Sequence, residues 1–223
     1  MGGLRGRVLP RRRTGRASAN GTSMLAPTLF AHGTQEQLDR VLPKMASGEE
    51  IWAQAWSEPE AGSDLASLRS TATRTEGGWL LNGQKIWSSR APFGDKAFGL
   101  FRSDPTAERH RGLTYFMFDL RADGVTVRPI KQLNGDTGFG EIFLDDVFVP
   151  DRDVIGEVND GWRAAMSTSS NERGMSLRSR HVSWPLLSGW FGCGNPAVAT
   201  ISATRLLTRG SRRKPTGCIH SAQ

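Results

Sequence analysis

Two stretches near the start of the chain carry the apolar spacing of amphipathic helices. Residues 24–32 form a short apolar run in which a helix begins or breaks at Pro27. The next stretch opens with a capping-box pattern, Thr34 followed by Gln37, and Gly48 lies where a helix C-cap is expected. Its apolar side chains fall on one helix face: Leu38, Val41, Leu42 and Met45.

From residue 51 to residue 150 the pattern changes to the short alternating or continuous apolar runs of β-strands. These runs cover residues 51–55, 68–75, 79–81, 97–102, 113–120, 125–130 and 141–149. Gly77 and Gly78 predict a turn, and Asn82-Gly83 is the strongest hairpin signal in the chain. The spacing of the turns predicts an antiparallel β-sandwich or a barrel-like domain.

Helical spacing returns after residue 156. Asp160 can cap a helix whose apolar face includes Trp162, Ala165 and Met166. Beyond about residue 179, Pro and Gly residues interrupt any helical pattern. The predicted fold class is therefore α+β, with an antiparallel sandwich or barrel-like domain flanked by helices.

The net charge of +7 belongs to the two ends of the chain. Of the 29 Lys and Arg residues, six precede Glu36, the first acidic residue, and eight follow Glu172, the last one. The middle keeps fifteen basic residues against 22 acidic ones, a balance of −7. A folded basic face is thus not expected, and the composition argues against a nucleic-acid-binding protein.

The remaining composition points to a soluble, cytoplasmic protein without a metal site. Cys193 and Cys218 stand in no metal-like spacing, and no apolar run approaches the roughly twenty residues of a membrane span. Residues 1–18 are rich in arginine but lack the apolar core of a signal peptide. They fit either a transit-like leader or a misassigned start.

Residues 56–64, WSEPEAGSD, are the first candidate for a functional site. A buried strand ends at Glu58-Pro59, because proline removes a backbone donor and keeps the residue before it extended. Gly62, Ser63 and Asp64 then form a polar loop that points outward. Such loops are frequent ligand sites, but an ordinary strand-to-loop transition has the same pattern.

Three blocks of the sequence resemble signatures of the acyl-CoA dehydrogenase family. WSEPEAGSD resembles its flavin loop, NGQKIWSS at residues 82–89 resembles its NGxKxWIT segment, and EIFLDDVFVP at residues 141–150 resembles its FDxVxVP strand. The resemblance covers about residues 24–179. It implies the end of an N-terminal helical domain at 24–50, a middle β-domain at 51–156 and the first helix of a C-terminal bundle at 157–179. Residues 1–23 and 180–223 are then a disordered basic head and a disordered tail foreign to the family.

The resemblance implies FAD as cofactor. A flavin ring needs hydroxyl and N–H groups at its polar edge, and Ser57 and Ser89 match family residues that supply them. Trp87 matches the indole that lies against the ring. Trp56, Gly62 and Ser88 complete the predicted cofactor-binding set. We expect Ser57, Ser63, Trp87 and Ser89 to surround one groove, although a solvated loop and a core tryptophan would explain the same residues.

The implied reaction is the α,β-dehydrogenation of an acyl-CoA thioester, with electron-transfer flavoprotein or a similar acceptor reoxidising the flavin. Ser63 and Arg173 are the predicted substrate-binding residues, although Ser63 also fits a turn shared with Asp64. Glu172 falls where some members carry the catalytic base, although a solvated surface Glu is equally consistent.

The full-length relatives imply a homo-oligomer. The family's usual base region has no counterpart here, which predicts a truncated and inactive member. The alternative is a non-catalytic β-domain that serves as a binding or interaction module.

Overall fold

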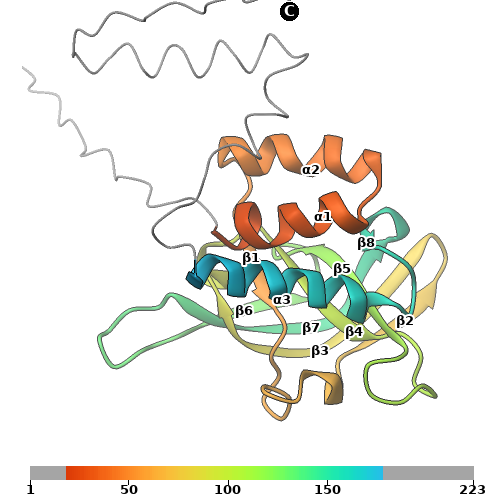
Figure 1. Ribbon diagram of the computed structural model, residues 1–223. Helices are drawn as coiled ribbons and strands as arrows, with labels where there is room; N and C mark the ends of the chain where they lie inside the picture. Colours follow the sequence, from red (N-terminus) through yellow and green to blue (C-terminus); the bar gives the residue numbers. More distant parts are fainter. Residues whose placement is uncertain (1–18, 178–223) are drawn as a thin grey trace, which may run out of the picture. The chain divides into compact units, whose positions relative to one another are not determined.

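Residues 19–177 are the part of the chain that the computed structural model describes, and predictions for residues 1–18 and 178–223 lie outside it. Within this part, eight strands form one sheet in the order β6-β7-β3-β2-β4-β5-β8, with β1 paired to β4 (Figure 1). The strands are β1 (Trp52–Ala55), β2 (Thr71–Thr75), β3 (Gly78–Ser89), β4 (Lys96–Arg102), β5 (Leu113–Asp119), β6 (Val125–Ile130), β7 (Phe139–Pro150) and β8 (Val154–Ile155).

Most neighbouring strands are antiparallel. The longest pairing joins β3 to β7, and a two-residue turn at Glu76-Gly77 joins β2 to β3, with Thr75 opposite Gly78. β1 runs parallel to β4, and a single parallel pair, Thr71 with Arg102, links β2 to β4. The predicted antiparallel domain is confirmed, with these parallel contacts added to it.

The sheet curls around an apolar interior. The ring of Trp79 on β3 lies 5.6 Å from the ring of Phe116 on β5, although these strands are not neighbours in the sheet. Buried side chains from six strands belong to the same cluster: Ala53, Ala72, Trp79, Phe101, Phe116, Phe118, Ile142 and Val147. The barrel-like character predicted from the turn spacing therefore reflects one curled sheet.

A second apolar cluster lies between the sheet and the helices. On β5, Leu113, Tyr115 and Met117 face this cluster, while Phe116 and Phe118 face the interior of the curled sheet. Residues on alternate faces of a strand are usually divided between core and solvent. β5 is buried on both faces, which explains its continuous apolar run.

In the described part of the chain, three α-helices lie on one side of the sheet (Figure 1): α1 (Ala26–His32), α2 (Gln35–Ser47) and α3 (Gly161–Leu177). Both hydrogen bonds of the predicted capping box are present at the start of α2, from the Gln37 N–H to Thr34 Oγ1 (3.2 Å) and from the Thr34 N–H to Gln37 Oε1 (3.0 Å). Gly48 ends the helix in the left-handed conformation. The predicted helix over this stretch is confirmed.

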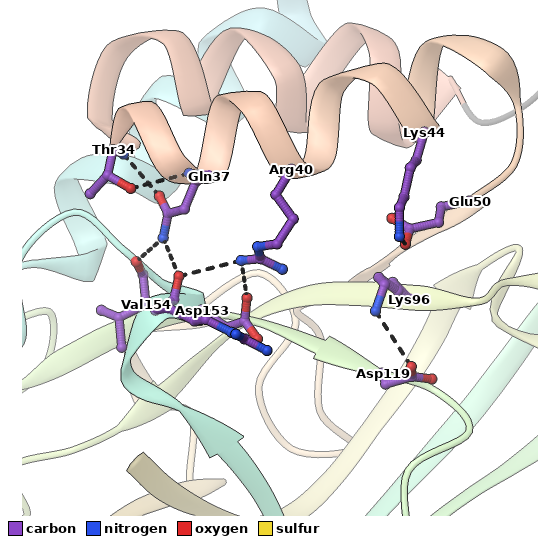
Figure 2. A network of polar contacts seen from close by, with 10 residues as sticks. Thr34, Gln37, Arg40, Lys44, Glu50, Lys96, Asp119, Asp153 and Val154 are labelled. Atoms are coloured by element: carbon purple, nitrogen blue, oxygen red, sulfur yellow. Dashed lines mark hydrogen bonds and ion pairs between the residues drawn. The ribbon is translucent and has the colours of Figure 1, made fainter. Parts of the chain in front are cut away.

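Polar contacts fasten α2 to the segment between β7 and β8. Figure 2 shows Gln37 and Arg40 pointing from the helix toward Asp153 and Val154. Gln37 Nε2 donates to the carbonyls of Arg152 (2.8 Å) and Val154 (2.6 Å), and Arg40 pairs with Asp153. The Gln37 side chain thus serves both the capping box and the docking of the helix.

The hairpin predicted at Asn82-Gly83 is wrong, because β3 continues through it as a bulge. Asn82 exchanges two hydrogen bonds with Asp146 on β7, at 2.8 and 2.9 Å, and the strand register shifts at this point. Gly83 has a φ of 137°, and a Cβ there would lie 2.3 Å from Ser70 Oγ. Asn-Gly is here a bulge that lets β3 pass close to the chain before β2.

The ordered helical region begins earlier than the predicted boundary at residue 24. A helical turn over Asn20–Leu25 leads directly into α1, and it buries Asn20. Asn20 Nδ2 donates to the carbonyl of Ser89 (3.1 Å). This long-range contact joins the helical turn to the end of β3, although residues 20–23 fall within the predicted disordered head. Helices and a curled sheet together confirm the α+β class.

Candidate functional site

The first predicted motif follows β1 and folds into a tight turn. The Glu58 N–H donates to the Ala61 carbonyl (2.9 Å), and the Ala61 N–H donates back to the Glu58 carbonyl (3.1 Å). Just before the turn, Trp56 and Ser57 are half-buried. The turn lies at the predicted Glu58-Pro59, although β1 already ends at Ala55, and it separates the half-buried Ser57 from the loop that follows.

The second predicted motif lies at an irregularity in β3. The pairing with β7 shifts register between Lys85 and Ser88, and Trp87 has a φ of 56°. A bulky residue in this left-handed region is strained by about 1–2 kcal/mol. The Trp87 side chain is 57% exposed, and its ring meets the edge of the Phe139 ring at 6.2 Å between centroids. Strained backbone under an exposed aromatic residue is typical of a ligand-binding position.

The structure brings the two motifs together. The N–H of Ile86 donates to the carbonyl of Ser57 at 2.8 Å, so the end of β1 is fastened to β3 one residue before Trp87. Ser57 and Trp87 are thirty positions apart in sequence, yet their backbones lie side by side. The groove expected to include Ser63 and Ser89 as well stays a prediction.

The two serines after Trp87 differ in their environment. Ser88 is 1% exposed, and its Oγ has no hydrogen-bond partner among the described residues. Ser89 is half-buried, and its carbonyl accepts the bond from Asn20. The Ser88 hydroxyl is thus turned inward, so we retain Ser57 and Ser89, and not Ser88, as candidate hydroxyl donors to a ligand.

A buried ion pair, which the sequence pattern did not predict, links the two motifs. Lys85 Nζ lies 2.7 Å from Glu58 Oε1 and donates to the carbonyl of Leu100 at 2.7 Å. Lys85 also sits over the ring of Phe101, 4.6 Å from its centroid. The sequence signal for this pair is two opposite charges, one in each motif, with Lys85 next to the apolar Ile86 within a strand.

The Glu58 carboxylate accepts two further hydrogen bonds. Its oxygens receive the backbone N–H groups of Arg69 (2.6 Å) and Ser70 (3.0 Å). Burial by itself would raise the pKa of Glu58. The charge of Lys85 and the hydrogen bonds from Lys85 and Arg69 outweigh burial, so this pKa lies below its ordinary value.

The loop beyond the turn is open. Gly62, Ser63 and Asp64 are exposed, and Asp64 pairs with Arg109 at 2.9 Å. A Cβ added at Gly62 would meet nothing within 4 Å. The described residues therefore give no steric reason for a glycine at this position, and the reason implied by the family, close approach of a ligand, stays a prediction.

A chain of buried polar groups links the first motif to α3. Trp56 Nε1 donates to Tyr115 Oη (3.1 Å), Tyr115 Oη lies 3.3 Å from Thr168 Oγ1, and Thr168 lies 2.7 Å from Thr28 on α1. Burial, and to a smaller extent the charge of Glu172, raises the pKa of Tyr115, so its hydroxyl stays protonated. The chain holds α3 over the sheet at a point one helical turn before Glu172.

Glu172 and Arg173 are both exposed on α3. Residues four apart lie on the same side of a helix, so Glu172 follows Thr168 on the side that faces Tyr115. The structure thus joins Ser57 to Ile86, the residue before Trp87, and joins the neighbouring Trp56 to the helix of Glu172 through Tyr115.

The fold is a small curled β-domain with helices on one side. Near the ends of β1 and β3, Ser57, Trp87 and Ser89 form one edge of this domain, which carries an exposed indole and two serine hydroxyls. Residues 53–147 match the family model described as acyl-CoA dehydrogenase, middle domain. The chain therefore carries the middle domain of the acyl-CoA dehydrogenase family.

Individual proteins agree with this assignment. The chain is 53% identical over 148 residues to acyl-CoA dehydrogenase FadE34 of Mycobacterium tuberculosis, a match that covers 66% of this chain and 21% of that protein. The crystal structure of the ChsE4-ChsE5 complex from Mycobacterium tuberculosis aligns with a TM-score of 0.62 at 33% identity, covering 67% of this chain and 38% of that one. The structure of PigA with FAD and proline aligns with a TM-score of 0.64 at 28% identity, covering 68% and 40%.

The chain spans less than half the length of each of these three relatives. Among residues 19–177, no helix combines the length and the apolar character needed to cross a membrane.

Proposed function

We propose that this chain supplies the flavin-binding β-domain of an acyl-CoA dehydrogenase, an oxidoreductase that introduces a double bond between the α and β carbons of an acyl-CoA thioester. One observation carries the proposal. The exposed and strained Trp87 directly follows Ile86, whose N–H binds the Ser57 carbonyl, inside the region that matches the family's middle domain. The presence of FAD in the PigA structure adds support.

The residues of this edge fit a flavin. Trp87 offers an exposed indole, and Ser57 and Ser89 are half-buried serines on the two adjoining segments. We assign Ser57 and Ser89 as donors to the polar edge of the ring, and Trp87 with the backbone at Trp56 as its packing surface. Gly62 leaves room for the ligand to approach the backbone. When bound, FAD supplies the acceptor for the β-hydride of the substrate.

The substrate would lie between the Ser63 loop and α3. We assign Ser63 and Arg173 to contacts with the acyl-CoA, and Glu172 as the carboxylate that removes the α-proton. Electron-transfer flavoprotein or a similar acceptor would then take up the electrons. The two named components of the ChsE4-ChsE5 complex support assembly with further chains.

We expect little turnover from the 223-residue polypeptide alone. Ser63, Trp87 and Glu172 are all exposed in the described part of the chain, whereas proton and hydride transfer require a site from which water is excluded. Dye-reduction assays with added FAD and a series of acyl-CoAs test this. FAD binding with weak turnover is the expected result.

Two other results would change the proposal. Robust turnover that Glu172→Gln abolishes would contradict the expected inactivity and establish Glu172 as the base. Robust turnover that Glu172→Gln leaves intact would remove Glu172 from the mechanism. Failure to bind FAD would favour the alternative, a non-catalytic binding module.

A further inference from the structure

The ion pair of Glu58 and Lys85 is more deeply buried than the other ion pairs of the described chain. The Lys85 side chain is 0% exposed and the Glu58 side chain 7%, whereas each of the other pairs has at least one side chain that is 25% exposed or more. Removing two charges from water costs about as much as their attraction returns, so apolar residues of similar volume are often equally stable. A contribution to global stability is therefore a poor explanation for this pair.

Each charge holds a different segment of the chain. The Glu58 carboxylate accepts the N–H groups of Arg69 and Ser70, where the chain returns from the exposed loop. Lys85 Nζ donates to the carbonyl of Leu100 on β4 and sits over the Phe101 ring. The pair thus ties both ends of the Ser63 loop to β3 and, through β3, to the centre of the sheet.

Both members of the pair are direct sequence neighbours of the residues that join the two candidate cofactor-binding segments. Glu58 directly follows Ser57, and Lys85 directly precedes Ile86, whose N–H binds the Ser57 carbonyl. The register shift that turns Trp87 outward begins immediately after Lys85. The ion pair therefore lies directly beside the contact between the two candidate cofactor-binding segments.

We propose that Glu58 and Lys85 are positioning residues whose ion pair fixes the Ser57 strand end relative to the Trp87 bulge before any ligand binds. The consequence for cofactor affinity rests on the proposed function, but the positioning itself is a property of this chain. A pair that served stability alone would be replaceable by apolar side chains without a change at Ser57 or Trp87.

The test separates position from stability with the double variant Glu58→Leu/Lys85→Met in the full chain. The variant removes both charges at similar volume, so loss of the pair by itself should leave the unfolding midpoint nearly unchanged. It also removes the acceptor for Arg69 and Ser70 and the donor to Leu100. The backbone N–H groups that lose the Glu58 acceptor should lower the midpoint moderately. We expect hydrogen exchange at the Ile86 amide to become about tenfold faster or more, while the amides of β5 keep their protection.

A matched control is Lys96→Met, which breaks the partly exposed Lys96–Asp119 pair on the neighbouring strands β4 and β5. We expect no change at Ile86 in this variant. If the double variant does not fold, Glu58→Gln keeps the shape and one acceptor oxygen, and it should still raise exchange at Ile86 severalfold. Exchange at Ile86 that equals the wild type in whichever of these variants folds would overturn the proposal.

FAD titration of the same proteins tests whether the positioning of the two segments also affects cofactor affinity. If the wild type binds FAD and the folded double variant binds it about tenfold more weakly, the pair positions the cofactor site. Equal FAD affinity in the two proteins would overturn that consequence. If the wild type does not bind FAD, the proposed function fails, while exchange at Ile86 still decides whether the pair positions the two segments.

Discussion

The candidate site has two sides that differ in how they are held. On the candidate cofactor side, the segments of Ser57 and Trp87 are joined by a buried ion pair and a backbone hydrogen bond. On the other side, Glu172 lies exposed on α3. The contacts of the first side lie within the curled sheet. On the second side, the contacts of Thr168 with Tyr115 and Thr28 hold α3 one helical turn before the Glu172 carboxylate. The chain therefore preorganises the candidate cofactor side, whereas the candidate base is held by α3 alone.

Among substitutions on the two sides, Lys85→Met should cause the largest loss of unfolding free energy. Removal of one partner leaves the Glu58 carboxylate buried without its counter-charge, which costs about 3–5 kcal/mol. Denaturant unfolding measures the loss. The control is Arg69→Met, which breaks an exposed pair with Glu60 and should cost within about 0.5 kcal/mol. Equal losses in the two variants would mean that burial of the pair has no energetic consequence.

The stabilising contribution of the Glu58 carboxylate, on the candidate cofactor side, should depend on pH. The pKa of Glu58 is lowered in the folded protein, so its ionised form stabilises the fold fully above the unfolded value, ordinarily 4.5. This contribution is lost as the pH falls from that value through the lower folded pKa. The advantage of the wild type over Glu58→Gln in unfolding free energy should therefore shrink below about pH 4.5. At pH 6 the difference in unfolding free energy between the two proteins should be on the order of the 1.5–3 kcal/mol of a charged hydrogen bond. If the difference stayed constant from pH 6 to pH 3, the lowered pKa of Glu58 would be contradicted.

A smaller loss is expected where the helix side joins the sheet. Tyr115→Phe removes the hydroxyl shared by Trp56 and Thr168 and should cost about 1–2 kcal/mol, since the part-buried indole N–H of Trp56 is left without its acceptor. Hydrogen exchange in α3 should rise more than exchange in β3. Ser170→Ala removes an exposed hydroxyl from the same helix and is the control. An unchanged α3 in Tyr115→Phe would show that other contacts position the helix.

The smallest effect on stability should come from Trp87→Gly, although this residue is central to the proposed site. Glycine relieves the strain of the left-handed backbone, while the ring contact with Phe139 is lost. The two changes oppose each other, so the unfolding free energy should stay within about 1 kcal/mol of the wild type. A loss of about 3 kcal/mol or more, as for a core aromatic residue, would show that Trp87 serves packing and not a ligand.

Local signals made much of this fold predictable from the sequence. Thr34, Gln37 and Gly48 define α2, because a capping box and a left-handed glycine act within the helix that they bound. The strand predicted over residues 125–130 matches β6, and the polar loop after Glu58-Pro59 follows from the backbone restriction that proline imposes.

Features that depend on distant partners were not predictable. Asn82-Gly83 carries the sequence of a hairpin turn, but Asp146 on β7 and the close approach of Ser70 make it a bulge. Likewise, nothing local to Asn20 indicates that it binds the Ser89 carbonyl sixty-nine residues away. The Glu58–Lys85 pair was not predictable for the same reason. A lysine inside a strand such as Lys85 indicates that a partner is needed, but it does not show which residue that partner is.

The central claim is that the edge formed by Ser57 and Trp87 binds a flavin, and equilibrium titration of the purified chain with FAD tests it most directly. We expect saturable binding with a shifted flavin absorption band, weakened about tenfold or more by Trp87→Gly. Phe93→Ala removes another exposed aromatic side chain, 60% exposed in the turn after β3, and should leave the affinity unchanged. No saturable binding by the wild type, or equal weakening by both substitutions, would contradict the account.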